Sequence, residues 1–390
     1  MAPAPRRTSA GRGTALALLA VVLLAAGCSS AGSPSATTTT NPGRPGASSS
    51  PSTEFAGRGP YVAGTLTITV HGDRTVIWYP ASRGSQRSRA PVSYLITSWL
   101  PRAVQLIVPK GFPDRVTEAA WDYLPFAPGR FPVVLFSHGT SGFPQQSSFL
   151  TTHLADWGFI VVAPDQTSRD LTAELRHRAQ LRPGRDIVQL RAAVEAVRAL
   201  ADRADDLFSG HVLNGAVAVV GDSSGGSVAL DMAAADPSVR VVVSLGGTPA
   251  RRMPSGIPTL FVAAGSDRLV PLSSLGHQYA AARAPKALLV VDDTGHNVFD
   301  DICTIAHARG GMVADARRLR LPVPRALLMM ATDGCNPPDL YPPLAWPLVE
   351  QATIAELRYG FGFDPTPLGL GTALASAFAG VRATYSSSGM

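Results

Sequence analysis

The segment 216–226 constrains the fold more than any other part of the chain. It reads Ala-Val-Ala-Val-Val-Gly-Asp-Ser-Ser-Gly-Gly, a β-branched run that ends in Gly-x-Ser-x-Gly and is followed by apolar residues at helical spacing. This order predicts a buried strand, a sharp turn and a helix, which together lift the hydroxyl of Ser223 above a parallel sheet. Glycines suit such a turn because its backbone is strained and its neighbours pack closely. The alternative is an ordinary glycine-rich turn, since the chain contains 37 glycines.

A serine hydroxyl needs a histidine base that is held in place by an acid. Both follow in the chain order that is typical of this turn, with the acid first. Two further buried strands are predicted over 259–265 and 286–291, and Asp267 and His296 come shortly after them. The carboxyl ends of parallel strands meet at one edge of a sheet, where ligands bind. We therefore expect Ser223, Asp267 and His296 to meet there as nucleophile, acid and base.

Each of these assignments has an alternative. Asp267 could cap a helix that starts near Leu272. Asp292 or Asp293 could orient the histidine instead, although triad geometry favours an acid from a neighbouring strand. His296 could be a packed loop residue or a metal ligand, but no cluster of metal-binding residues at ligand spacing surrounds it, and we expect no metal.

Two backbone N–H groups are also needed to stabilise an oxyanion. One candidate is the amide of Ser224, directly after the nucleophile, and the other should come from the loop after an earlier strand. Residues 131–142 predict that strand and a loop in which glycines let the amide of Thr140 face the site. His138 competes with His296 as the base by residue type, but its place before this loop favours a structural hydrogen-bonding role.

Several short motifs, in a fixed order and spacing, carry a resemblance to a known family. They are Gly59-Pro60-Tyr61 with Gly64, Trp78-Tyr79-Pro80, Ser98-Trp99-Leu100-Pro101, residues 131–142, residues 154–165 and His296-x-x-Phe299-x-Asp301. Over about residues 58–302 the chain resembles the α/β-hydrolases that include platelet-activating-factor acetylhydrolases and bacterial cutinase-like polyester hydrolases. The resemblance implies a serine carboxylic ester hydrolase of the lipase or esterase type, which works through an acyl-enzyme without a cofactor.

The chain departs from the acetylhydrolases at two positions. Their acid lies one strand earlier, in a region that here reads Ser-Leu-Gly-Gly-Thr-Pro-Ala over 244–250 and holds no carboxylate. The position of Asp267 instead resembles the cutinase-like and dienelactone-hydrolase pattern. The residue before the nucleophile is Asp222, where the relatives usually carry histidine.

The rest of the chain agrees with an α/β fold. Residues 239–245 predict another buried strand, and a helix that begins at Asp186 places apolar residues on one face at three-and-four spacing. Strands that alternate with helices indicate a mostly parallel sheet covered on both faces. We expect one hydrolase domain over 58–390.

Two segments lie outside the minimal fold. The insertion 82–128 carries aromatic and apolar residues, and it is equally compatible with a lid over the acyl site and with scaffold packing. The C-terminal extension 303–390 contains a predicted helix over 348–357, and for this extension we favour scaffold packing. Phe143 and Phe299 are expected to line the acyl site.

The N-terminus has the features of a targeting segment. Arginines precede an apolar run over 14–26, which is shorter than the ~20 residues needed to span a bilayer, and the run ends in Ala-Ala-Gly-Cys. This resembles a bacterial lipoprotein box and implies a signal peptide over 1–27 and a lipid on Cys28 that anchors the exported protein to the outer face of a cell membrane. The alternatives are a plain secretory signal and an uncleaved anchor. Residues 28–57, rich in Ser, Thr, Pro and Gly, predict a disordered tether.

The other two cysteines, Cys303 and Cys335, can pair in an oxidising compartment just beyond His296; the alternative is two unpaired buried thiols. The formal charge of +6 falls to +3 without the three arginines of 1–27, a stretch that has no acid. No basic run indicates nucleic-acid binding, and no cofactor fingerprint is present. The expected partners are a small-molecule or lipid ester and, through Cys28, a membrane.

Two other functions use the same residues differently. The triad could transfer an acyl group to an envelope sugar or lipid, or the chain could be a surface binding protein on a hydrolase scaffold that has lost catalysis. The complete order of serine, acid and histidine argues against the second.

Overall fold

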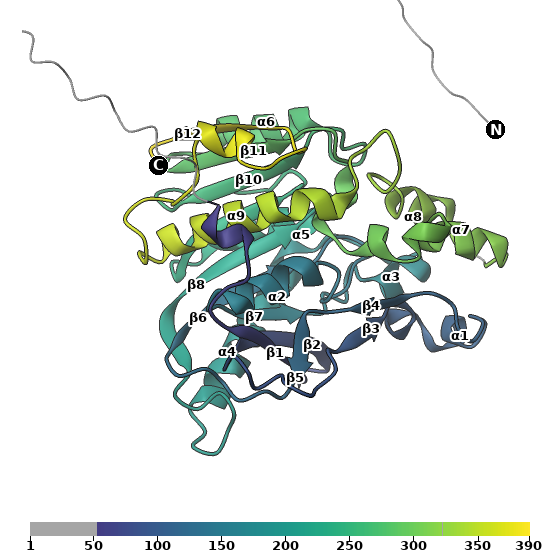
Figure 1. The fold of residues 1–390 in the computed structure, drawn as a ribbon, viewed down its shortest axis with the longest axis horizontal. Coiled ribbons are helices and arrows are strands. Elements are labelled where there is room, and N and C mark those ends of the chain that lie inside the picture. The colour runs from purple at the N-terminus through teal and green to yellow at the C-terminus, as the bar shows by residue number, and fades with distance from the viewer. Residues whose placement is uncertain (1–52, 322) are drawn as a thin grey trace, which may run out of the picture. The chain divides into compact units, whose positions relative to one another are not determined.

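The computed structural model describes residues 53–321 and 323–390. A ten-stranded sheet runs through them in the order β12-β11-β10-β9-β8-β6-β7-β2-β1-β5 (Figure 1). Its strands are, in chain order, β1 (Val62–Val70), β2 (Asp73–Ala81), β5 (Ala120–Asp122), β6 (Phe131–Ser137), β7 (Ile160–Pro164), β8 (Val212–Asp222), β9 (Val239–Leu245), β10 (Thr259–Ala264), β11 (Lys286–Val291) and β12 (Ala383–Ser388). The strands β3 (Ser93–Leu95) and β4 (Arg115–Thr117) form a separate pair.

The centre of the large sheet is parallel. All neighbours from β7 through β6, β8, β9 and β10 to β11 pair in parallel. The antiparallel pairs are β2 with β7, β1 with β2, and β12 with β11. The predicted mostly parallel sheet is therefore confirmed.

Helices cover both faces of this sheet. The α-helices are α1 (Arg102–Gln105), α2 (Ser148–Asp156), α3 (Leu171–Leu175), α4 (Pro183–Ala201), α5 (Ser224–Ala235), α6 (Leu272–Ala281), α7 (Gly311–Arg318), α8 (Arg325–Met330) and α9 (Pro342–Gly360). The short 3₁₀-helices are η1 (Glu54–Ala56), η2 (Ile96–Trp99), η3 (His296–Phe299), η4 (Ile302–Thr304), η5 (His307–Arg309) and η6 (Thr372–Ser376).

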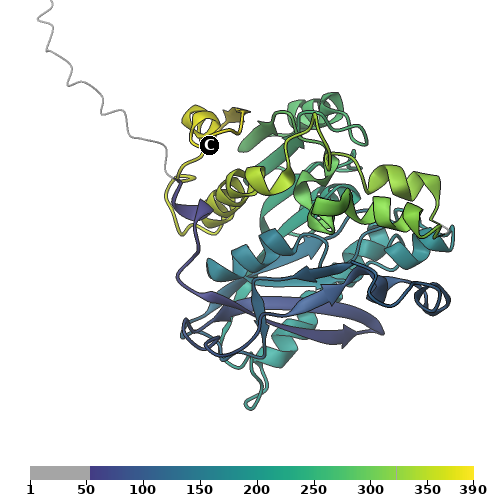
Figure 2. The same ribbon diagram turned by 45° about the vertical axis from the view of Figure 1, so that its right-hand side comes forward.

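Strand β8 shows how the core is divided between the two faces. Successive side chains of a strand point to opposite faces. Ala218 and Val220 pack into the apolar layer under α2 and α9, whereas Val217 and Val219 pack into the layer under α4 and α5. Figure 2 shows α9 crossing the first of these faces. Residues 217–222 of β8 are buried, and because both faces of the sheet are covered here, residues 216–220 read as a continuous apolar run.

Two predicted helices are longer than expected. The helix expected from Asp186 begins at Pro183, where the fixed φ of proline suits the first turn. The helix expected over 348–357 is α9, which extends over Pro342–Gly360 and also begins with proline.

The expected tether over 28–57 is wrong at its C-terminal end. Residues 1–52 lie outside the described residues, but Glu54–Ala56 form η1. Phe55 is buried against Trp157 at a ring distance of 4.9 Å, and its N–H donates a 2.8 Å hydrogen bond to Gln351 Oε1. One aromatic side chain thus ties this end of the polar segment to the core, so the folded part includes residues before the expected start at 58.

The C-terminal extension contributes in two ways. Strand β12 adds an antiparallel edge to β11 and α9 covers the sheet, which fits the expected scaffold role. Helices α7 and α8, however, lie at the same end of the molecule as α1 from the insertion (Figures 1 and 2).

Candidate active site

Ser223 occupies the sharp turn between β8 and α5. Its backbone has φ 54° and ψ −122°, a left-handed conformation that non-glycine residues rarely adopt. The turn is so tight that a Cβ on Gly221 would lie 2.1 Å from the carbonyl oxygen of Gly225. The glycines on either side of the serine are therefore required by close backbone approach, and the predicted strand, turn and helix are present.

Asp267 and His296 meet in the loops that follow β10 and β11. His296 Nδ1 lies 2.7 Å from Asp267 Oδ2, and both residues are buried. The other carboxylate oxygen, Oδ1, accepts hydrogen bonds from the N–H groups of Leu269 (2.8 Å) and Val270 (2.7 Å). These bonds fix the carboxylate, so the imidazole has one orientation.

The alternative acids lie elsewhere. The side chain of Asp293 pairs with Arg382 at the surface, and the backbone N–H of Asp292 bonds the carbonyl of Arg382. The helix after Asp267 is preceded by Pro271 as its N-cap, so Asp267 does not cap it directly. Among the candidate carboxylates, Asp267 makes the hydrogen bond to His296.

Ser223 and His296 line the same cavity. In the part of the chain that the structure describes, no hydrogen bond joins the hydroxyl to the imidazole. Such contacts are often long until substrate binds. Gly246 lies beneath the ring: its φ is +52°, and a Cβ there would approach His296 Cε1 to 3.4 Å.

The charges around His296 favour its protonated form. Burial disfavours the imidazolium, but the hydrogen bond to Asp267 and the negative charges of Asp222, Asp267 and Asp300 outweigh it and raise the pKa of His296 to about 9. Burial raises the pKa of Asp222 to about 6. It also raises the pKa of Asp300 well above its ordinary value.

His138 has a structural role, as expected. Its Nε2 accepts a 2.9 Å hydrogen bond from the N–H of Gln166, so the proton is on Nδ1, which lies 2.8 Å from the carbonyl of Gly139. Both ring nitrogens are occupied. The imidazole therefore supports the loop after β6 and is not available as a base.

The loop after β6 passes very close to Ser223. A Cβ on Gly139 would lie 2.9 Å from Asp222 Oδ2 and 3.1 Å from Ser223 Cβ. Thr140 lines the cavity and its hydroxyl bonds the hydroxyl of Ser224 at 2.9 Å. Ser224 is the first residue of α5, where the backbone N–H groups have no partner inside the helix. The two predicted oxyanion residues therefore lie side by side.

A cavity of about 410 Å³ opens above these residues. Thr140, Asp222, Ser223 and His296 form its polar base, together with Asp300. Its walls are apolar and come mainly from two segments, with Ile96, Leu100, Val104, Ile107, Val108 and Phe112 on one side and Met312, Val313, Ala316, Leu321, Val323, Leu327, Leu328, Met330 and Ala331 on the other. A site of this volume and character fits an apolar small molecule.

Residues 119–245 match the family model of chlorophyllase. This range runs from β5 to β9 and includes the loop of Thr140 and the turn of Ser223, whereas Asp267 and His296 lie beyond it. The match and the mostly parallel sheet agree with the earlier resemblance. The chain belongs to the α/β-hydrolase superfamily. The matched family indicates an ester hydrolase of this type, and no curated protein matches the chain.

The α/β-hydrolase uses one of the two predicted phenylalanines in its cavity. Phe143 lines it and packs against Tyr94 and Trp99. The prediction for Phe299 is wrong: this ring is fully buried in the core under Gly246 and does not line the cavity. Phe299 lies one turn from His296 in η3, and its side chain points into the protein instead.

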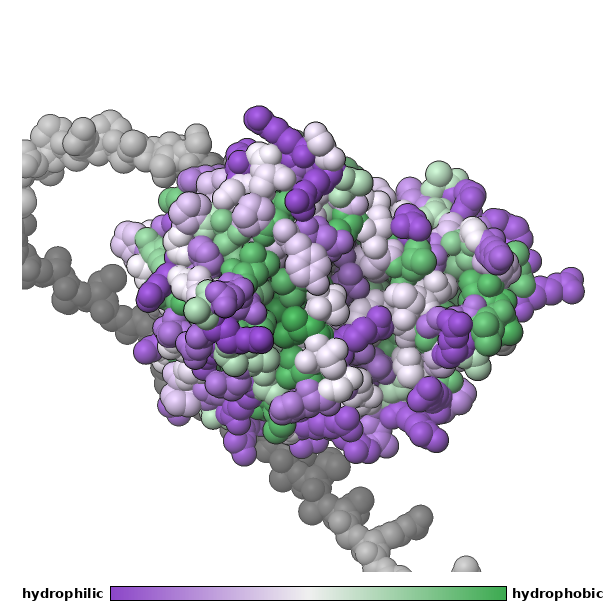
Figure 3. All heavy atoms as spheres, turned by 90° about the horizontal axis from the view of Figure 1, so that it is seen from below, coloured by the Kyte–Doolittle hydropathy of each residue, from purple (hydrophilic) through white to green (hydrophobic). Residues whose placement is uncertain are grey.

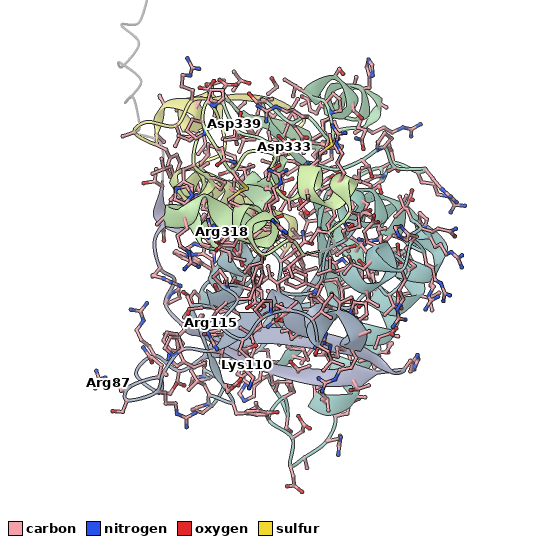
Figure 4. All side chains as sticks on the ribbon, turned by 90° about the vertical axis from the view of Figure 1, so that its right-hand side faces the viewer. Arg87, Lys110, Arg115, Arg318, Asp333 and Asp339 are labelled. Atoms are coloured by element: carbon pink, nitrogen blue, oxygen red, sulfur yellow. A yellow bond between two sulfur atoms is a disulfide. The ribbon has the colours of Figure 1, made fainter. Side chains whose placement is uncertain are left out.

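The extension of the hydrolase also differs from the expected scaffold, because α7 and α8 form one cavity wall. The predicted disulfide Cys303–Cys335 is present and encloses both helices. Arg268, next to Asp267, bonds Asp333 (2.6 Å) and Asp339 (2.8 Å), which are labelled in Figure 4. The wall is thus tied to the loop that carries Asp267.

Two further site residues were not predicted. Gln146 Nε2 donates a 2.6 Å hydrogen bond to Asp222, and Asp300 lines the cavity beside His296. The only sequence signal for Asp300 is its place inside the motif that starts at His296. Within the described ranges, the hydrolase has no group of three or more metal-ligating side chains and no helix long and apolar enough to cross a membrane.

Proposed function

We propose that the protein is a serine ester hydrolase that cleaves esters with an apolar acyl or alcohol group. The observation that carries this proposal is the 2.7 Å hydrogen bond between Asp267 and His296 at the base of the cavity that Ser223 also lines. A carboxylate, an imidazole and a strained serine at one sheet edge suit acyl transfer through a covalent intermediate.

In the first half of the reaction, Ser223 Oγ attacks the ester carbonyl and its proton passes to His296 Nε2. The N–H groups of Thr140 and Ser224 stabilise the oxyanion of the tetrahedral intermediate. Asp267 stabilises the imidazolium. When the C–O bond breaks, the imidazolium gives its proton to the departing alkoxide, so an alcohol leaves and the acyl group stays on Ser223.

In the second half, water replaces the alcohol. Neutral His296 takes a proton from water as its oxygen attacks the acyl-enzyme carbonyl. Collapse of the second tetrahedral intermediate returns this proton to Ser223 and releases the acid. The apolar walls of the cavity limit competing water and hold the hydrocarbon part of the substrate.

We also propose that the protein works outside the cell, held by a lipid on Cys28. The basic start, the short apolar run and the Ala-Ala-Gly-Cys sequence support this part of the proposal. Metabolic labelling with a fatty acid tests it: the label should enter the protein and should be absent from Cys28→Ser.

A fluorophosphonate probe tests the catalytic proposal. It should label the protein, and Ser223→Ala should abolish labelling, whereas the control Ser238→Ala on the turn before β9 should leave it unchanged. Ser223→Ala and His296→Ala should each lower turnover of nitrophenyl esters by at least ~10³-fold, with free acid as the product. Labelling that persists in Ser223→Ala, or near-normal turnover by His296→Ala, would contradict the proposal.

A further inference from the structure

The cavity reaches the surface between two segments that are distant in the chain, 96–118 and 303–331. Ile107 lines the cavity and yet is 54% exposed, which places the opening beside it. Helices α7 and α8 form the opposite wall. We call the exposed part of these two segments the mouth surface.

Large apolar side chains on the mouth surface point into solvent. Leu106 is 72% exposed, Met329 58% and Leu319 44%, and none of the three lines the cavity. Single exposed apolar residues are ordinary, but a group around the opening of an apolar site indicates an interaction surface. In Figure 3, apolar atoms gather at the right-hand end of the molecule, bordered by hydrophilic atoms.

The exposed charged side chains of the mouth surface are all positive. All its lysines and arginines are exposed: Arg102, Lys110, Arg115, Arg309, Arg317, Arg318, Arg320 and Arg325. Its acids are Asp114, Glu118 and Asp315, and all three are buried. Figure 4 faces this end and labels Lys110 and Arg115 on one segment and Arg318 on the other.

We infer that the mouth surface docks the protein on an anionic lipid surface, so that the ester passes from the lipid directly into the cavity. The inference rests on the proposed ester hydrolysis, because it names the setting in which that site meets its substrate. Exposed leucine and methionine would enter the lipid while the surrounding arginines contact the anionic headgroups. Buried acids leave no exposed negative charge in these segments to oppose contact.

A fluorophore at the mouth surface tests this directly. The full chain carrying Cys28→Ser cannot receive a lipid there, and Leu106→Cys then offers a single exposed thiol, since Cys303 and Cys335 are paired. Vesicles that contain phosphatidylglycerol should shift the emission of an environment-sensitive label to the blue. Pure phosphatidylcholine should give a smaller shift, and salt should reduce the shift on the anionic vesicles.

The matched control is a label at Val188→Cys. Val188 is 61% exposed on α4 and does not line the cavity, so its emission should not change. Because the N-terminal apolar run could itself contact vesicles, it is the difference between the two label positions that reports docking by the mouth surface.

Two sets of variants test the contact of the arginines with the headgroups separately from the contact of the apolar side chains with the lipid interior. Arg317→Gln with Arg320→Gln and Arg325→Gln should weaken docking on anionic vesicles about fivefold for each cation, on the order of a hundredfold in total. Leu106→Ser with Leu319→Ser and Met329→Ser should lower hydrolysis of a vesicle-embedded ester while leaving turnover of soluble nitrophenyl acetate unchanged.

Three outcomes would overturn the inference: no shift at position 106, an equal shift at position 188, or a shift without vesicles that grows with protein concentration, which would indicate a second copy of the chain. The experiment repeated in Ser223→Ala should give the same shift. If the protein with Ser223 intact docked on the vesicles but was not labelled by a fluorophosphonate, the proposed hydrolysis would be contradicted while the inference of lipid docking would remain.

Discussion

Gln146 connects two loops of the candidate active site through a single side chain. Its Nε2 donates a 2.6 Å hydrogen bond to Asp222 Oδ2, and its Oε1 accepts a 3.2 Å hydrogen bond from the N–H of Gly139. Asp222 directly precedes Ser223 and Gly139 directly precedes Thr140. The side chain therefore sets the distance between the serine and the loop that would stabilise the oxyanion.

Replacing this side chain should slow the chemical step. In Gln146→Leu both hydrogen bonds are lost, so the Thr140 loop can move away from Ser223, and we expect kcat to fall about 10- to 100-fold with a smaller change in KM. Steady-state kinetics on nitrophenyl acetate measures this. Gln189→Leu is the control, because Gln189 also bonds a carboxylate, Asp73, but on α4 away from the cavity. Equal kcat in Gln146→Leu and the parent, with an intact circular dichroism spectrum, would show that the connection is dispensable.

The pH dependence should reveal the charge of Asp222. The base must be neutral, so kcat/KM should rise with pH until the imidazole of His296 is deprotonated near its pKa of about 9. A nearby negative charge stabilises the imidazolium, and Asp222 is ionised above its own pKa of about 6. Asp222→Asn removes that charge but keeps an oxygen for Gln146. The rise in kcat/KM should therefore move to lower pH, and superimposable profiles would exclude this coupling.

Asp267 and Asp293 offer a paired test of the triad acid. Asp267→Asn keeps an oxygen that can accept from Leu269 and Val270 but removes the charge that stabilises the imidazolium, so we expect kcat to fall by ~10³- to 10⁴-fold. Asp293→Asn affects only an exposed pair with Arg382 and should change kcat little. Similar losses in the two variants would mean that the hydrogen bond to Asp267 does not define the acid.

Glu356 should make the stability of the fold fall as pH rises from mildly acidic values to about 8. This residue of α9 is fully buried, neither of its carboxylate oxygens has a hydrogen-bond partner among the described residues, and burial raises its pKa to about 8. The folded state thus keeps a proton that the unfolded state loses, so the free energy of unfolding falls as pH rises from the ordinary glutamate value towards about 8.

Glu356→Gln removes this dependence, because glutamine has nearly the same shape and does not ionise. Thermal unfolding should show a higher Tm than the parent protein above pH ~8 and a similar Tm below pH ~5. Glu195→Gln, an exposed position on α4, is the control and should follow the parent at both pH values. A constant difference in Tm at all pH values would place the effect in packing rather than ionisation.

The sequence predicts well where the loops of Ser223, Asp267 and His296 lie, because chain order and strand pattern decide their positions. Ser223, Asp267 and His296 each follow an apolar β-branched run, and parallel strands bring such loops to one edge. The direction in which a side chain points within a short helix cannot be predicted from chain order and strand pattern. His296 and Phe299 belong to the same 3₁₀-helix, yet one faces the cavity and the other the core.

The cavity wall and the start of the fold depend on distant partners. Apolar residues of α7 and α8 have the same spacing whether they face a core or a cavity, so no local pattern distinguishes the two. The position of Phe55 is decided by Trp157 and Gln351, which are far away in the chain. The contact between Gln146 and Asp222 likewise follows from the approach of two loops and has no motif of its own.

Strand β12, at the edge of the sheet and near the end of the chain, supports the strand that leads to the loop of His296. This strand supplies the neighbour of β11 along its whole length, from Lys286 opposite Ser388 to Val291 opposite Ala383. The histidine loop leaves the end of β11, so its support is synthesised long after the serine turn and the histidine themselves. The base that we propose for Ser223 is therefore firmly held only when these last residues are in place, so the proposed hydrolysis requires nearly the whole domain.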